Sequence, residues 1–350
     1  AITLSCLLEA CGCIGMAEKG RNIHAEICSR GFLKGDMVIG NALVDMYSKC
    51  GLFSKALEMF NSLPTRDTIT WTILIGGYVK HELGKEALHC YEQMLVEGFR
   101  PDVATFVITL KACSLIGALI RGLEIHEELS RRGFSEGNHS IGNALVNLYS
   151  KCGSLRKAQE MFDKFPSKDV VAWNALISGY VKCGCGEKAL KCFEKMQGQG
   201  LSPNIVTFVS VLKACGSTRN ARKGIEMHGE IHRYRLPETN IFVGSVLVEM
   251  YAKCGLLSEA RYVFENLLDQ DEVSWNTLLV GYSQIGESEN VFNLFQRMLG
   301  TGQKPDTVTL VSILNVCNHA GKVDEGHVYF EAMSKEYGII PTPEHHTCLA

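Results

Sequence analysis

Residues 170–204 read VVAWNALISGYVKCGCGEKALKCFEKMQGQGLSPN, and this stretch decides the fold. Each half has apolar residues at the i, i+4, i+7 spacing of one helix face. These residues are Trp173, Ile177 and Tyr180, and then Ala189, Phe193 and Met196. Gly184 and Gly186 separate the two runs, and Gly200 and Pro203 close the second. The stretch therefore predicts two short helices joined by a tight turn.

The same pattern recurs along the whole chain with a period of 102 residues. The three tryptophans have this spacing: Trp71, Trp173 and Trp275. Three further series keep it: Cys11, Cys113, Cys215 and Cys317; His24, His126 and His228; Cys50, Cys152 and Cys254. A period of 102 residues is too long for one helical hairpin, and it divides into repeat units of 36, 31 and 35 residues.

These repeat units are expected to fill the chain in a fixed order. The 36-residue units are 1–36, 103–138, 205–240 and 307–342; the 31-residue units are 37–67, 139–169 and 241–271; the 35-residue units are 68–102, 170–204 and 272–306. Residues 343–350 begin an eleventh unit that is cut off. One such hairpin cannot bury its apolar face alone, whereas stacked hairpins can. The sequence thus predicts an all-α fold in which residues 1–350 form a single α-solenoid with a long concave groove.

Composition narrows the functional classes. A formal charge of −3 argues against a broadly basic nucleic-acid coat, although it permits a narrow basic stripe. No run of 18 apolar residues occurs, so no membrane partner is expected. The 15 cysteines include no C-x-x-C pair and recur mostly once per unit, which favours a reducing compartment over a disulfide framework.

Several segments carry a specific resemblance to a known family. They are GNALVDMYSKCG (40–51), WNALISGYVK (173–182) and TFVSVLKAC (207–215), with the unit ends SKD (167–169) and LSPN (201–204). They resemble plant pentatricopeptide repeat proteins of the PLS subclass, whose L, S and P motifs alternate with the 36-, 31- and 35-residue lengths found here. The resemblance covers the whole chain. Residues 331–348 resemble the last L motif and the start of the last S motif before a C-terminal editing-related extension, which is absent here.

The resemblance implies a right-handed α-solenoid of helix-turn-helix repeats that binds single-stranded RNA. Repeats of this family read about one base each, which is the general rule for such arrays. Family members reside in mitochondria or chloroplasts, take part in mRNA processing, and most often mark sites for C-to-U RNA editing. The resemblance therefore implies RNA as the partner, possible contacts with editing-complex proteins, and no cofactor, small-molecule substrate or enzyme activity in the array.

The family reads bases with the fifth and the last residue of each repeat unit. In the S units these are Asn41 with Asp67, Asn143 with Asp169, and Ser245 with Asp271; in the P units they are Thr72 with Asp102, Asn174 with Asn204, and Asn276 with Asp306. Small polar residues inside apolar helix starts are unexpected for core packing. Helix capping is the alternative, and it explains the last residue better than the fifth, which already lies within the helix.

The L units differ at the fifth position, where the first has Ser5 and the others have Val107, Val209 and Val311. Because valine cannot hydrogen-bond to a base, these units are expected to act as spacers or to bind weakly. The resemblance also implies that the second residue of a unit stacks on a base. The candidates are Val38, Ile69, Val171, Phe242 and Val273, while Ala104 and Ser140 are smaller. Core packing is the alternative for this position.

A lysine recurs at the thirteenth position of the S and P units. The series is Lys49, Lys80, Lys151, Lys182 and Lys253, and Gln284 interrupts it. A line of lysines on equivalent helices can follow a phosphate backbone. The alternative is that these are ordinary solvated surface lysines.

Enzymatic signals are weak. H-x-E occurs at His24, His126 and His228, but the P-C-x-x-C that completes a zinc deaminase site does not occur. The C-x-C pairs that begin at Cys11 and Cys183 lack a second pair, so no metal site is expected. Two functional classes remain: an RNA binder and a protein- or peptide-binding scaffold of tetratricopeptide type. The polar fifth and last residues favour the first, and the 34-residue period of tetratricopeptide arrays is not found.

Overall fold

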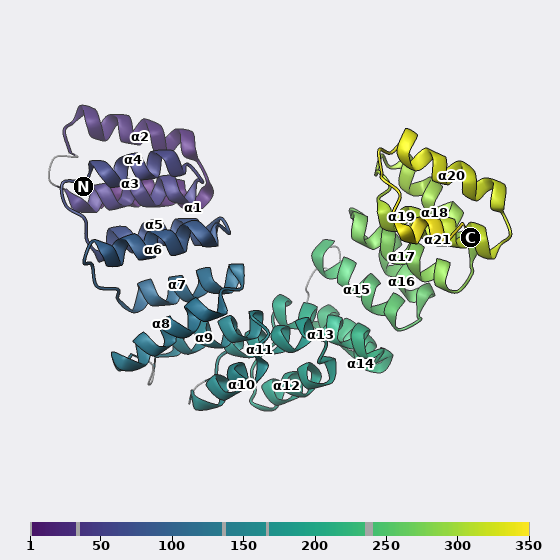
Figure 1. Cartoon of the computed structure of the whole chain (residues 1–350). Helices are drawn as coiled ribbons and strands as arrows, with labels where there is room; N and C mark the ends of the chain where they lie inside the picture. Colours follow the sequence, from purple (N-terminus) through teal and green to yellow (C-terminus); the bar gives the residue numbers. More distant parts are fainter. Residues whose placement is uncertain (1, 33–35, 135–137, 166–167, 235–240, 350) are drawn as a thin grey trace. The chain divides into compact units, whose positions relative to one another are not determined.

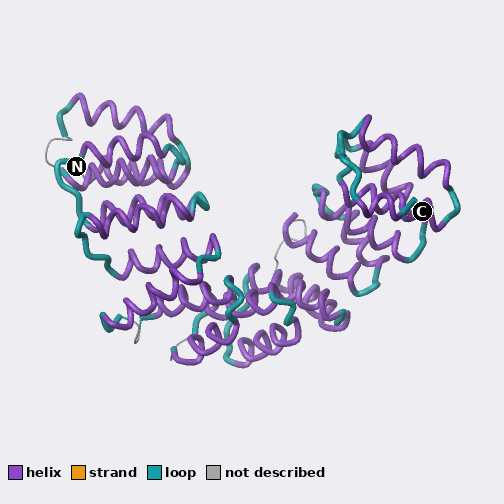
Figure 2. The backbone as a smooth tube through the Cα atoms, in the orientation of Figure 1, coloured by secondary structure: helices purple, strands orange, loops and turns teal. Residues whose placement is uncertain are grey.

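The computed structural model describes residues 2–32, 36–134, 138–165, 168–234 and 241–349. Over these ranges the chain forms 21 α-helices. Figure 2 shows helices and loops, and no strand, in the part of the chain that the structure describes. The predicted all-α fold is therefore confirmed. None of the helices in the described ranges combines the length and the apolar character needed to cross a membrane.

The helices form two compact bodies, Ala1–Lys182 and Cys183–Ala350, each a stack of helical hairpins (Figure 1). The N-terminal body holds α1 (Ile2–Ile14), α2 (Ala17–Ser29), α3 (Met37–Lys49), α4 (Phe53–Ser62), α5 (Thr68–Lys80), α6 (Gly84–Val96), α7 (Val103–Ile116), α8 (Leu119–Arg131), α9 (His139–Lys151), α10 (Leu155–Lys164) and α11 (Val170–Lys182). The C-terminal body holds α12 (Gly186–Gly198), α13 (Ile205–Thr218), α14 (Ala221–Arg233), α15 (Ile241–Lys253), α16 (Leu257–Glu265), α17 (Glu272–Gln284), α18 (Ser288–Gly300), α19 (Thr307–His319), α20 (Val323–Lys335) and α21 (Pro343–Thr347).

The odd-numbered helices, here called A helices, open the predicted repeat units. From α3 to α21, each begins at the first residue of a predicted unit. The even-numbered B helices complete the hairpins. The boundary between the two bodies falls between α11 and α12, inside the predicted unit 170–204. The assignment of L, S and P units stays a prediction, and its unit ends at residues 1, 240 and 350 lie outside the described residues.

The residue before an A helix caps that helix. Asp67, Asp102 and Asp306 each accept the backbone N–H of the third helical residue, and the hydroxyl of that residue completes a capping box. Asn204 caps α13 in the same way. An N-cap satisfies a backbone donor that the helix itself leaves without a partner. The last residue of a predicted unit therefore fixes where the next A helix starts.

The A helices form the more closely packed layer of each body. In the N-terminal body each A helix from α1 to α9 packs on the next one, and α13, α15, α17 and α19 do the same in the C-terminal body. B helices pack on A helices, and within the described residues no two B helices make an extensive contact. The core keeps the 102-residue period. Three T-shaped aromatic pairs join successive hairpins at ring-centroid distances of 4.6, 4.5 and 4.6 Å: Phe60 with Trp71, Phe162 with Trp173, and Phe264 with Trp275.

The histidines of the three H-x-E segments also belong to this packing. Nδ1 of His24, His126 and His228 lies 2.8, 2.7 and 2.8 Å from the hydroxyl of Tyr47, Tyr149 and Tyr251, respectively. Each bond joins a B helix to the following A helix. Burial lowers the pKa of His24 and of His126, which favours the neutral imidazole in this contact. The three segments thus serve interhelical contacts at equivalent places.

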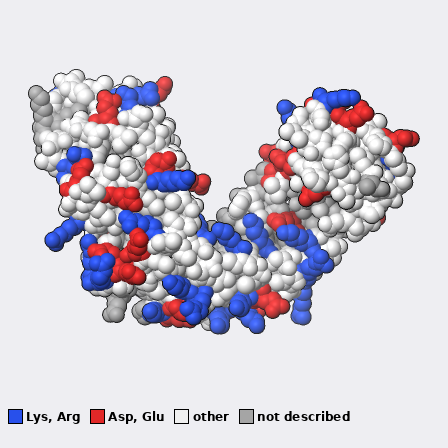
Figure 3. All heavy atoms as spheres, in the orientation of Figure 1, with Lys and Arg blue, Asp and Glu red and all other residues white. Residues whose placement is uncertain are grey.

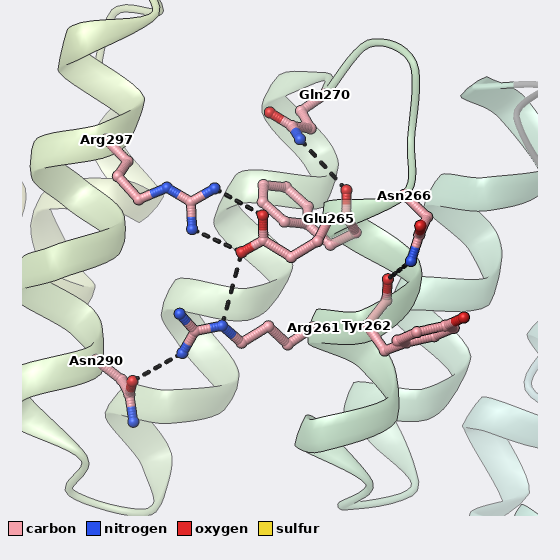
Figure 4. A network of polar contacts seen from close by, with 8 residues as sticks. Arg261, Tyr262, Glu265, Asn266, Gln270, Asn290 and Arg297 are labelled. Atoms are coloured by element: carbon pink, nitrogen blue, oxygen red, sulfur yellow. Dashed lines mark hydrogen bonds and ion pairs between the residues drawn. The ribbon is translucent and has the colours of Figure 1, made fainter.

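Charged side chains connect neighbouring B helices (Figure 4). The guanidinium of Arg297 in α18 donates two hydrogen bonds of 2.6 and 2.8 Å to the carboxylate of Glu265 in α16. Nε of Arg261 lies 3.7 Å from Oε1 of the same carboxylate, and Nη1 of Arg261 donates a hydrogen bond of 3.0 Å to Asn290 Oδ1. The hydrogen bond from Arg297 lowers the pKa of Glu265. This layer is therefore stabilised by polar contacts at its surface, whereas the A layer is stabilised by apolar packing.

The cysteines are free thiols in the described residues, and many lie in the helix contacts. Burial raises the pKa of Cys113 and of Cys215 to about 12. A thiol with so high a pKa is almost entirely protonated at neutral pH and therefore reacts slowly.

Close approach of the A helices requires glycine at one equivalent position. Gly77 in α5 faces Ser48 of α3, and a Cβ built on Gly77 collides with the Cβ of Ser48. Gly179 in α11 is 102 residues further on, and a Cβ there would lie 2.5 Å from the Cβ of Ser150. By contrast, a Cβ on the neighbouring Gly76 would come no closer than 3.6 Å to Ile108.

We expect Gly77→Ala to lower the free energy of unfolding by about 1–3 kcal/mol, because overpacking forces α3 and α5 apart. Gly76→Ala is the matched control, and it should raise the free energy by up to about 1 kcal/mol through helix propensity alone. Urea denaturation followed by circular dichroism measures both. Equal effects of the two substitutions would show that the α3–α5 contact is not close-packed at Gly77.

Candidate nucleic-acid interface

One face of the A helices carries all the sequence-predicted site residues that lie within these helices. The second, fifth, ninth and thirteenth helical residues are three or four positions apart, so they share one side of the helix, here called the A face. In α5 they are Ile69, Thr72, Gly76 and Lys80. The second and thirteenth residues are about 16 Å apart at the helical rise of 1.5 Å per residue. One end of the A face therefore carries the second and fifth residues, and the other end carries the basic thirteenth residue.

The second residues are exposed, and the core-packing alternative for them is wrong. Their exposed fractions lie between 57% and 61%: Val38, Ile69, Val171, Phe242 and Val273. Ala104 and Ser140 are exposed as well. Three L units add Ile2, Val206 and Val308, which are 79%, 54% and 46% exposed. The sequence interpretation missed these three residues, although they occupy the second position of their units.

Three fifth residues donate a hydrogen bond directly to the last residue of their unit. Asn143 Nδ2 lies 2.9 Å from Asp169 Oδ2, Ser245 Oγ lies 3.0 Å from Asp271 Oδ2, and Asn276 Nδ2 lies 3.0 Å from Asp306 Oδ2. The structure therefore brings together two residues that are about thirty positions apart in the sequence.

Two further pairs meet through a threonine, the third residue of the next unit. Thr70 Oγ1 lies 2.9 Å from Asn41 Oδ1 and 2.8 Å from Asp67 Oδ1. Thr105 Oγ1 lies 2.7 Å from Thr72 Oγ1 and 2.8 Å from Asp102 Oδ1. The remaining pair is divided between the bodies, with Asn174 in α11 and Asn204 before α13.

Helix capping and the contact with the fifth residue use different oxygens of the last residue. Oδ1 of Asp169, Asp271 and Asp306 accepts the backbone N–H of the next helix, while Oδ2 faces the fifth side chain. Partial burial opposes ionisation of Asp306, but hydrogen bonds from the backbone and hydroxyl of Thr309 and from the amide of Asn276 outweigh burial and lower its pKa. The Asp306 carboxylate is therefore an acceptor at neutral pH. The capping alternative is correct for these aspartates, and it leaves Oδ2 with a lone pair for a ligand.

A groove of about 400 Å³ opens on the A face of α15, α17 and α19. Asn276 and Asp306 line it, and the exposed Val273 and Val308 of successive units flank them. A larger groove of about 790 Å³ lies beside α4, α5 and α6 and contains none of the predicted site residues. The A-face groove thus combines two apolar walls with several polar groups: the amides of Asn276 and Gln284, the carboxylates of Glu249, Glu272 and Asp306, and the ammonium of Lys253.

The fifth residues of the L units are in keeping with a weaker role. Val209 is buried, and Val107 and Val311 are partly buried. Their expected action as spacers stays a prediction.

The thirteenth-position lysines fall into two groups. Lys49 and Lys253 form ion pairs of 2.6 Å with Asp45 and Glu249, four residues earlier in the same helix. Lys80 and Lys182 instead donate to the last backbone carbonyl of the preceding A helix. Lys80 Nζ lies 3.4 Å from the carbonyl oxygen of Lys49, and Lys182 Nζ lies 2.9 Å from that of Lys151.

Within the described ranges, no carboxylate forms an ion pair with Lys80, Lys151 or Lys182, and all three side chains are exposed. Figure 3 shows Lys and Arg interspersed with Asp and Glu on the face in view, with no uniform basic field. The basic character predicted for the thirteenth position is thus concentrated in these three lysines of the N-terminal body.

Comparison with known proteins identifies the repeats. The family model described as "PPR repeat family" matches residues 66–114, 168–217 and 270–319. The model described as "PPR repeat" matches residues 41–67, 143–170 and 245–271. Together these matches cover more than half of the chain.

Curated relatives from Arabidopsis thaliana match nearly the whole chain. Pentatricopeptide repeat-containing protein At2g33680 is 38% identical over 332 residues, which cover 94% of this chain and 45% of the relative. Pentatricopeptide repeat-containing protein At4g25270, chloroplastic, is 36% identical over 345 residues, with 98% and 64% covered. The chain thus spans about half the length of the relatives it matches.

Solved structures share the fold. The pentatricopeptide repeat protein PPR10 in complex with an 18-nt psaJ RNA element matches with a TM-score of 0.72 at 20% identity, covering 91% of this chain and 48% of that one. PPR10 from maize matches with a TM-score of 0.53 at 20% identity, covering 99% and 56%. The helical hairpins, the repeat matches and the relatives agree, and the chain belongs to the pentatricopeptide repeat (PPR) family.

Proposed function

We propose that this chain binds single-stranded RNA in a sequence-specific manner, with the S and P repeat units each holding one base on the A face. The observation that carries this proposal is the pairing of fifth and last residues beside an exposed apolar second residue. Exposed apolar side chains next to fixed polar groups suit a planar ligand with a hydrogen-bonding edge. The structurally similar PPR10 was solved with an RNA element.

In this proposal, one base enters the groove beside Asn276. The two faces of the base stack against Val273 and Val308, and the edge of the base contacts Asn276 and Asp306. An ionised carboxylate only accepts hydrogen bonds, so a terminal Asp favours uracil or guanine, whose ring nitrogen carries a hydrogen. A short Ser or Thr at the fifth position leaves room for guanine, while Asn suits a pyrimidine.

This chemistry specifies an order of bases. We take the RNA to run 5′ to 3′ from the N-terminal repeat unit and let the L units accept any base (N). The ten complete units then favour N-U-G-N-U-Y-N-G-U-N, where Y is a pyrimidine at the unit with Asn174 and Asn204. The phosphates lie toward the basic end of the A face, near Lys80, Lys151 and Lys182.

The biological role that we propose is to mark a site on an organellar transcript, most often for C-to-U editing by partner proteins. The subclass resemblance supports this role, and so do relatives whose names include "chloroplastic" and "mitochondrial". The array supplies the address on the RNA, and we assign no catalytic residue to it.

Replacing Lys80, Lys151 and Lys182 with Ala should weaken binding to all RNA sequences alike. Because each phosphate contact releases counterions, the slope of log affinity against log salt should become shallower by about 2 for three lost contacts on a single strand. Lys49→Ala with Lys253→Ala is the matched control, and it should change the slope less because these lysines already pair with carboxylates. Fluorescence anisotropy titrations at several salt concentrations measure both. A triple variant that binds like the parent would mean that these lysines are only solvated surface.

Thr72→Asn should move the base preference of one repeat unit from guanine to uracil. The carboxylate of Asp102 is unchanged, so a base with a ring N–H is still favoured. The larger amide fills the space that a purine needs. We expect discrimination of about 1–3 kcal/mol, the size of a good base contact. The parent and the variant are titrated against two RNAs that differ only at the third position of the expected sequence. An unchanged preference would exclude Thr72 as a reading residue, and a change at another nucleotide would disprove the register.

A further inference from the structure

The third residue of the next repeat unit contacts the fifth residue of a unit. This third residue has no role in the base selection proposed above. Around Asn276, Thr309 Oγ1 lies 2.7 Å from the amide oxygen, while the amide nitrogen lies 3.0 Å from Asp306 Oδ2. The ionised carboxylate only accepts, so the nitrogen of Asn276 must face Asp306. Its oxygen therefore faces Thr309, whose single hydroxyl hydrogen is shared between this oxygen and Asp306 Oδ1, which lies 2.8 Å away.

A buried threonine also contacts the fifth residue at the start of α5, although Asn41 there meets Asp67 through Thr70 and not directly. The oxygen of Asn41 lies 2.9 Å from Thr70 Oγ1. Thr70 and Thr309 are completely buried, so water cannot replace either hydroxyl as a partner. In both places the amide oxygen is occupied by a buried donor. The amide can then offer a base only its N–H groups.

Two units break this pattern in different ways. The unit after Asn143 has Ala172 at its third position, and Asn143 makes one described hydrogen bond, from its nitrogen to Asp169. The unit after Ser245 has Ser274, whose hydroxyl donates to the backbone carbonyl of Asp271 at 2.8 Å. Asn143 is therefore an otherwise equivalent asparagine whose oxygen has no hydroxyl from the next unit.

The sequence carries the same match between neighbouring units. Polar fifth residues of S and P units precede third residues that are polar with one exception: Thr70, Thr105, Ala172, Thr207, Ser274 and Thr309. The fifth-position valines of the L units precede apolar or ring-bearing third residues: Ile141 after Val107, Val243 after Val209, and His345 after Val311. The third position thus matches the polarity of the preceding fifth position at seven of ten junctions, and the exceptions are Ser5 before Ile39, Asn143 before Ala172, and Val311 before His345.

We propose that Thr70 and Thr309 are positioning residues for base selection. Their hydroxyls hold the amide oxygens of Asn41 and Asn276, so that only amide N–H faces the base. Ala172 has no hydroxyl and leaves the oxygen of Asn143 available. This inference rests on the proposed RNA binding. A uracil carbonyl accepts from the amide N–H, and the uracil ring N–H meets the aspartate. Cytosine presents an amino group instead, which needs an acceptor such as a free amide oxygen. Asn41 and Asn276 therefore reject cytosine more strongly than Asn143 does.

The test compares RNAs that carry U or C at one position at a time, along the whole expected sequence, so that no register is assumed. Ala172→Thr should raise the ratio of U to C affinity at the nucleotide facing unit 139–169 by about two- to tenfold, the effect of one hydrogen bond. Thr309→Val should lower the ratio by a similar factor at the nucleotide facing unit 272–306, whereas Thr309→Ser keeps the hydroxyl and should preserve it. Ser274→Ala removes a third-position hydroxyl that donates to the backbone carbonyl of Asp271, and it should leave selection unchanged.

Thermal melting by circular dichroism measures the stability of each variant. The higher U to C ratio expected for Ala172→Thr is measured on a different variant, so it does not depend on whether Thr309→Val folds. RNA binding with unchanged U to C ratios in both Ala172→Thr and Thr309→Val would overturn the inference while leaving the proposed function intact. Thr309→Val that weakens U and C binding equally would assign Thr309 to helix capping alone and would also overturn it. A parent chain that binds no single-stranded RNA would refute the proposed function, and this inference with it.

Discussion

The hydrogen bond from the backbone N–H of an A helix to the residue just before that helix is the constraint on which the arrangement depends. Asp67, Asp102 and Asp306 accept this bond with Oδ1. An N-cap of this kind contributes about 1 kcal/mol to helix stability. At Asp306 the bond also aims the second oxygen at the fifth residue of the preceding A helix. Where the capping residue is an aspartate, the contact that starts the helix therefore also places a carboxylate beside the preceding A helix.

The A face combines features that a helix interface without a ligand would not retain. Most of its second residues are apolar and exposed, and exposed apolar side chains at equivalent places of successive helices favour association with a partner. Its polar groups are fixed by short hydrogen bonds, with buried threonines behind them. A rigid polar edge reduces the conformational entropy lost on binding. The exposed valines and the fixed amides thus divide the task between stacking and selection.

Much of this organisation follows from the sequence. The 102-residue period located the A helices, because cap residues and apolar spacing mark each helix start. The sequence alone could not decide whether Asp306 caps a helix or faces the fifth residue. One carboxylate does both, because it accepts the Thr309 backbone N–H and the Asn276 amide. The exposure of Val273 depends on how neighbouring helices pack, which spacing alone does not determine. The pairing of Lys49 with Asp45 was readable as an i, i+4 contact but was overlooked. The separation into two bodies at Lys182 has no counterpart in the repeat pattern.

Selection of ligands from a random pool of single-stranded RNA by the purified chain tests the central claim most directly. The account predicts enrichment of one family of sequences in which the fixed bases are U and G in the order set by the S and P repeat units. Every third position should stay variable, because an L unit faces it. Equal retention of all sequences would contradict base reading at the fifth and last residues. Enrichment of a motif without the three-base periodicity would contradict the assignment of the A face as the reading surface.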